Sequence, residues 1–121
     1  SHGMKIIIHS CGNTTALLEW FADCGFDGVH PLEPTAGMEL ATAKELVGER
    51  MCLIGNLDIT YILVSASREE VFAAVRQAIH DAGQGGGYIL APDHSHPDIS
   101  VERLHWMVEA AHEYGRYPLE V

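Results

Sequence analysis

Side chains that can bind metal or transfer protons follow several short apolar runs of this sequence. His9 and Cys11 follow the first run, Glu33 the second, Asp58 the third and His94 the last. Residues i and i+2 of a strand point to the same side, so His9 and Cys11 can face one site. Imidazole nitrogen and thiolate sulfur are ligands that zinc takes in proteins. A single H-x-C pair is a weak metal signature, and both residues can equally pack at the end of a strand.

The apolar runs alternate with helical patterns along the whole chain, and these elements must position the reactive residues. Strands are expected over residues 4–8, 26–32, 51–54 and 88–91, and helices over residues 14–24, 38–47, 67–83 and 101–114. Alternation of this kind predicts an α/β fold with parallel strands and right-handed crossovers. In such folds the carboxyl ends of the strands form the active face, which is where the candidate residues lie.

Local signals mark where several helices begin and which residues they bury. Residues 67–70 form a capping box, and Ser100 is a second N-cap candidate. The apolar positions of the helices predict that Cys24, Leu46, Val101 and Val108 face the core, together with Cys52 of the third strand. Residues 59–64 form a further short apolar segment. Asp58, just before it, is expected either to cap a turn or to contact a substrate.

Composition excludes some classes of partner. The formal net charge of the 121 residues is −10, with 17 acidic and 7 basic side chains, which disfavours nucleic acid and anionic membrane surfaces. No apolar run approaches the length of a membrane span. An odd number of cysteines without a visible export signal predicts a cytoplasmic protein. Residues 1–3 are expected to be a cloning remnant before Met4, and residues 4–121 a single domain.

Four phrases, in this order, resemble the superfamily of uroporphyrinogen decarboxylases and cobamide methyltransferases. They are the H-x-C-G-N phrase at residues 9–13, the G-N-L-D phrase at 55–58, the strand at 87–90 followed by His94 and a P-D turn, and the Y-G-x-Y phrase at 114–117. The resemblance implies a (β/α)8 barrel of which this chain is the C-terminal half, with about four βα units. A complete barrel takes about 250 residues, so dimerisation or a missing half is expected to cover the exposed surfaces.

The resemblance also implies a metal site. In the methyltransferase branch an H-x-C pair and a later cysteine hold zinc; His9 and Cys11 match the pair, and His94 stands at or beside the third position, with histidine in place of cysteine. Glu33 is then a fourth ligand or a partner of the ligands. His94 and Asp58 are the candidate catalytic residues. In the decarboxylase branch a histidine at the place of His94 lies in the substrate pocket.

Three functions therefore stand side by side. The first is a zinc- and thiol-dependent methyltransferase that acts on a small molecule with a corrinoid carried by a partner protein or by the substrate. The second is a decarboxylase-like lyase of tetrapyrrole metabolism. Its anionic substrate calls for basic residues at the mouth, and the Lys and Arg residues here fall outside the strand ends. The third is a non-catalytic half-barrel, used in assembly or produced by truncation, and the isolated half is expected to lack full activity.

Overall fold

Four strand–helix units make up the computed structural model, which describes residues 2–121; Ser1 of the expected cloning remnant lies outside them. The strands are β1 Ile7–His9, β2 Gly28–His30, β3 Cys52–Leu57 and β4 Tyr88–Pro92. The helices are α1 Leu18–Asp23, α2 Leu40–Val47, α3 Arg68–Ala82 and α4 Val101–Tyr114. Short 3-10 turns at Thr15–Leu17 and Pro34–Ala36 and a π-helical turn at Ile59–Leu63 lie in the loops that follow the strands.

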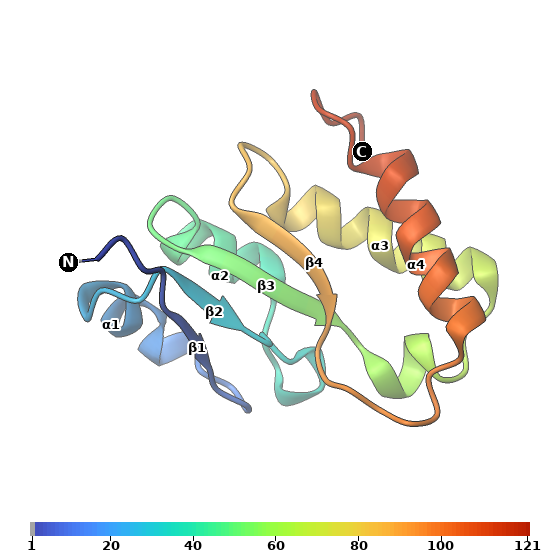
Figure 1. The fold of residues 1–121 in the computed structure, drawn as a ribbon, viewed down its shortest axis with the longest axis horizontal. Coiled ribbons are helices and arrows are strands. Elements are labelled where there is room, and N and C mark those ends of the chain that lie inside the picture. The colour runs from blue at the N-terminus through green and yellow to red at the C-terminus, as the bar shows by residue number, and fades with distance from the viewer. Residues whose placement is uncertain (1) are drawn as a thin grey trace.

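The strands form one parallel sheet in the order β1-β2-β3-β4. Their register sets Ile7 opposite Gly28, Gly28 opposite Cys52, and Leu53 opposite Tyr88. In Figure 1 the arrowheads run toward one end of the molecule, α2 and α3 lie behind the sheet, and the near face of the sheet carries no helix. The helices that follow β2 and β3 therefore return along the same face of the sheet, and α4 packs on α3. The prediction of half a (β/α)8 barrel is confirmed.

The core lies between the sheet and its helices. The alternation of burial along β3 identifies the face that points to the helices: Leu53 and Leu57 are buried, whereas Cys52 and Ile54 are partly exposed. Leu53 of β3 and Val71 of α3 belong to the same core cluster, and both have no exposed surface. Burial of such aliphatic side chains is the main term that stabilises the half-barrel.

The opposite face of the sheet is apolar and open. Ile7 of β1 is 54% exposed and Ile89 of β4 is 52% exposed, and both line a shallow hollow with Cys52 and Ile54 of β3. In a complete barrel this face would be the packed interior. The β-branched run at residues 4–8 has the sequence pattern of a buried strand, although Ile6 and Ile7 are exposed here and only Ile8 packs against the core.

Several expected core positions are exposed. Cys24 follows the last turn of α1 and is exposed, since α1 ends at Asp23. Leu46 of α2 is 37% exposed, and Val101 and Val108 of α4 are 69% and 47% exposed. The apolar stripe of α4 is narrower than expected because α3 covers only one of its sides.

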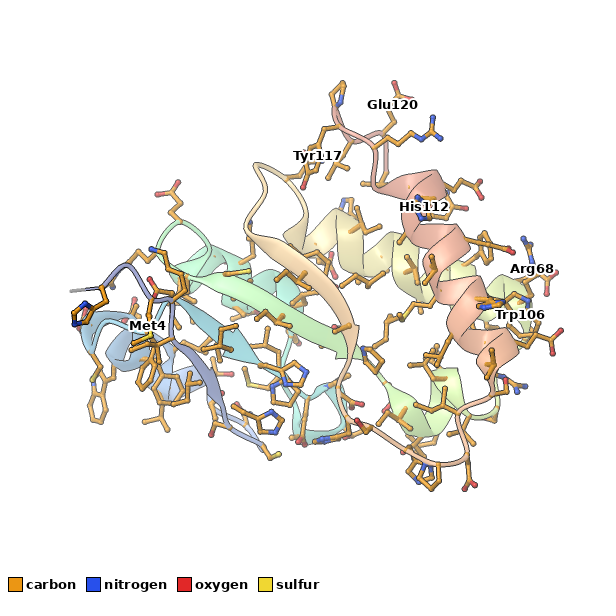
Figure 2. All side chains as sticks on the ribbon, in the orientation of Figure 1. Met4, Arg68, Trp106, His112, Tyr117 and Glu120 are labelled. Atoms are coloured by element: carbon orange, nitrogen blue, oxygen red, sulfur yellow. The ribbon has the colours of Figure 1, made fainter. Side chains whose placement is uncertain are left out.

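Both predicted helix caps are confirmed. The Ser67 hydroxyl accepts a hydrogen bond from the Glu70 backbone N–H, and the Ser100 hydroxyl accepts one from that of Arg103. The Tyr117 hydroxyl donates to the Gly83 carbonyl. Figure 2 shows Tyr117 at the end of the molecule opposite the strand arrowheads, so the closing Y-G-x-Y phrase lies away from the candidate site. Within residues 2–121, no helix has the length and apolar character to cross a membrane.

Candidate metal-binding site

His9 and Cys11 meet at the end of β1. The strand ends at His9, and Cys11 lies in the loop that follows it. The expectation that both residues lie on the strand is therefore wrong. The loop nevertheless brings the Cys11 Sγ to 3.4 Å from the His9 Nε2. Two ligands of one tetrahedral zinc stand about 3.3 to 3.8 Å apart, given the usual Zn–N and Zn–S bond lengths. The pair is therefore spaced as two zinc ligands would be.

His94 completes a group of three donors. It follows β4, the strand at the opposite edge of the sheet from β1. One ligand atom from each of His9, Cys11 and His94 lies within 4.8 Å of the other two. Two imidazoles and one thiol suit zinc, and small side-chain rotations bring such a group to bonding distance. The donor set therefore fits the predicted metal.

Glu33 touches two members of this group. It precedes the turn Pro34–Ala36, and its Oε1 lies 2.8 Å from the His94 Nε2. Burial acts to raise the pKa of the Glu33 carboxyl. A hydrogen bond with the Cys11 thiol and the charge of His94 outweigh burial and hold that pKa below its usual value. Glu33 is thus an ionised neighbour of the donors, placed where a fourth ligand or a partner of the ligands would stand.

The thiol of Cys11 responds in the opposite direction. Its hydrogen bond to the Glu33 carboxylate, followed by desolvation and by the negative charges of Glu33 and Asp93, raises the pKa of Cys11. Without a metal the thiol therefore keeps its proton at neutral pH. A bound metal ion reverses this preference, because the ligand is the thiolate.

Two aspartates stand on the same side of the molecule with different roles. Asp58 caps the turn Ile59–Leu63, since its Oδ2 accepts the Tyr61 N–H at 2.6 Å. Its expected contact with a substrate stays a prediction. Asp93, next to His94, is only 3% exposed, and within residues 2–121 its Oδ1 has no hydrogen-bond partner. Burial raises the pKa of the Asp93 carboxyl, and the charge of Asp58 adds to this.

One site residue, His30, was missed by the sequence reasoning. It is the last residue of β2 and pairs in register with His9. Its Nδ1 lies 2.9 Å from the His9 Nδ1, and its Nε2 lies 3.2 Å from the Pro92 carbonyl oxygen. The second strand was expected to continue to residue 32, which hid His30 inside a strand. Its position before Pro31 was the available signal, because a proline limits how a strand continues.

Comparison with known families gives one clear match. The model of the uroporphyrinogen decarboxylase family matches residues 1–114. Curated relatives fall in two groups of enzymes. A methylcobamide:CoM methyltransferase of Methanosarcina barkeri is 31% identical over 109 residues, which are 89% of this chain and 30% of the relative. A uroporphyrinogen decarboxylase of Thioalkalivibrio sulfidiphilus is 36% identical over 101 residues, which are 83% of this chain and 27% of the relative.

A solved structure agrees with the sequence relatives. A methyltransferase from Methanosarcina mazei superposes with a TM-score of 0.78 at 26% identity, over 94% of this chain and 32% of that one. The chain therefore spans about a third of the length of the proteins it resembles.

Proposed function

Because the chain belongs to the uroporphyrinogen decarboxylase family, we propose that it carries the zinc-binding part of a methyltransferase that acts on a thiol. The observation that carries the proposal is the convergence of His9, Cys11 and His94 within 4.8 Å. The similarity of the chain to the methylcobamide:CoM methyltransferase and to the Methanosarcina mazei methyltransferase supports the methyltransferase branch of the family.

The chemistry follows from the residues around the proposed ion. A zinc bound here would lower the pKa of a substrate thiol and keep it as the thiolate, which is the nucleophile for methyl transfer. His9, Cys11 and His94 would hold the ion. Glu33 accepts a hydrogen bond from the Cys11 thiol and could pass to water the proton that this thiol loses when it becomes a ligand. Its Oε1 also orients the His94 ring through Nε2.

Charge favours this branch over the decarboxylase branch. Glu33 and Asp93 surround the donors with negative charge, which suits a cation and opposes a substrate with several carboxylates. Three of the seven basic side chains are engaged elsewhere: Lys44 donates to the Gly86 carbonyl, Arg50 pairs with Asp23 and Arg68 pairs with Glu109. A tetrapyrrole substrate would need its basic partners from another part of a barrel.

The remaining parts of the activity are proposals about a larger assembly. The chain spans about a third of the length of its relatives, so a second copy or another barrel segment would complete the mouth. A corrinoid, carried by a partner protein or by the substrate, would supply the methyl group. We expect little methyl transfer from the isolated chain.

The metal content of the purified protein tests the proposal. Protein prepared without a metal-affinity step and loaded with zinc is expected to retain about one zinc per chain after dialysis, as measured by inductively coupled plasma mass spectrometry. Retention of no zinc would contradict the proposed site and would favour a non-catalytic half-barrel over a methyltransferase.

The open face of the sheet predicts self-association. The open face carries an apolar surface formed by Ile7, Ile54 and Ile89, which would face water in a monomer. We expect light scattering after size-exclusion chromatography to give a dimer or larger species at micromolar concentration. Ile89→Glu places a charge on this face and is expected to shift the protein toward monomer. Val101→Glu, at a position 69% exposed on α4, is the matched control. A monodisperse wild-type monomer would contradict the prediction.

A further inference from the structure

The hydrogen bonds of His30 form a chain with a defined direction. Its Nε2 lies 3.2 Å from the carbonyl oxygen of Pro92, and its Nδ1 lies 2.9 Å from the Nδ1 of His9. A carbonyl oxygen only accepts, so the hydrogen in the first contact belongs to the His30 Nε2. In a neutral imidazole the other nitrogen is then a bare acceptor. The hydrogen in the second contact must therefore belong to the His9 Nδ1.

This direction leaves one nitrogen of His9 free of hydrogen. With Nδ1 protonated, the Nε2 of neutral His9 keeps its lone pair. Nε2 is also the atom that lies 3.4 Å from the Cys11 Sγ, and it can accept the thiol hydrogen when that hydrogen is not directed to Glu33. A metal takes an imidazole only through a bare nitrogen.

We propose that His30 is a positioning residue that holds His9 in the Nδ1–H tautomer and so presents its Nε2 to the metal. The consequence for metal binding rests on the proposed zinc site, whereas the tautomer itself does not. His30 never contacts the ion in this arrangement. It acts through His9, as partners of metal-bound histidines do when they accept the second ring N–H.

The series of hydrogen bonds from Pro92 through His30 to His9 begins at the backbone of β4, a strand with which β2 does not pair. Pro92 ends β4, and β3 lies between β2 and β4 in the sheet. The rings of His9 and His30 also lie close, with centroids 4.9 Å apart. His30 therefore orients the His9 ring from a fixed point of the sheet rather than from a mobile loop.

Two variants separate the hydrogen bond from simple packing. His30→Leu fills space without an acceptor. His30→Asn keeps an acceptor, because its Oδ1 can stand near the place of the histidine Nδ1 and receive the His9 N–H. Circular dichroism of both variants reports whether the fold is retained.

The test reads the tautomer and the metal affinity separately. Long-range 1H–15N correlation spectra of the metal-free full chain, at about pH 8, where free histidine is neutral, report which His9 nitrogen carries hydrogen. Wild type and His30→Asn are expected to show Nδ1–H, and His30→Leu a larger share of Nε2–H. Competition with a chromogenic chelator is expected to give zinc affinity about 10- to 100-fold lower in His30→Leu and near wild type in His30→Asn.

The outcomes distinguish this inference from the proposed zinc site. An Nε2–H tautomer of His9 in the wild type, or zinc affinity and tautomer unchanged in His30→Leu, would overturn the role of His30 while zinc binding stands. An Nδ1–H tautomer that depends on His30 in a protein that binds no zinc would support the positioning role and refute the metal site.

Discussion

Cys11→Ala is expected to abolish stoichiometric zinc binding, whereas Cys24→Ala is expected to leave it unchanged. Both thiols are exposed, but only the Cys11 Sγ belongs to the group formed with His9 and His94. Loss of a thiolate ligand should weaken binding by more than the roughly 10- to 100-fold that follows loss of a ligand's partner. Chelator competition and metal analysis after dialysis measure the difference.

His94→Ala gives a second, independent test of the same group. It removes the only donor of the group that comes from the β4 edge of the sheet, so zinc retention should fall as it does in Cys11→Ala. His112→Ala on α4 is the matched control, since Figure 2 shows His112 on that helix, away from the strand arrowheads. Equal zinc retention in His94→Ala and wild type would show that the metal, if bound, is held by other residues.

Leu53→Ala is expected to lower the free energy of unfolding by about 3 kcal/mol, within the range measured for buried leucines. Leu53 lies in the middle of the sheet against the helix layer and has no exposed surface. Its removal loses apolar burial and leaves a cavity that rigid neighbours fill only in part. Since domains are stable by only about 5–15 kcal/mol, this is a large fraction of the total. Urea denaturation followed by circular dichroism measures the change.

Leu46→Ala makes the same chemical change at a position that is 37% exposed on α2. Its cost should be well under half of that for Leu53→Ala, because water already reaches part of the side chain and alanine favours the helix. Similar losses in the two variants would mean that the core does not lie where the burial pattern places it.

The sequence predicted the order and type of the main elements because each strand and helix carried its own local signal. Alternating β-branched runs and helical stripes gave the four parallel units, and Ser67 and Ser100 marked two helix starts that the structure confirms. The gathering of His9, Cys11, Glu33 and His94 at one end also followed, since parallel strands place their carboxyl ends together.

What the sequence did not reveal depends on tertiary contacts. Val101 and Cys24 are apolar enough for a core, but their exposure depends on where the neighbouring helices end. His30 lay hidden because its role comes from register with His9 and from the carbonyl of Pro92, 62 residues away. No local pattern encodes a contact of that kind.

The donors come from the ends of the two edge strands and from the loops that follow them, and this has a mechanical consequence. Neighbouring strands are about 4.8 Å apart, so three spacings would set β1 and β4 about 14 Å apart in a flat sheet. His9 and Cys11 from one edge nevertheless meet His94 from the other within 4.8 Å. The distance between the donors therefore depends on the curvature of the sheet. A substitution that flattens the sheet would move the donors apart without contacting any of them. An ion bound by these donors would cross-link the two edges of the sheet and keep it curved.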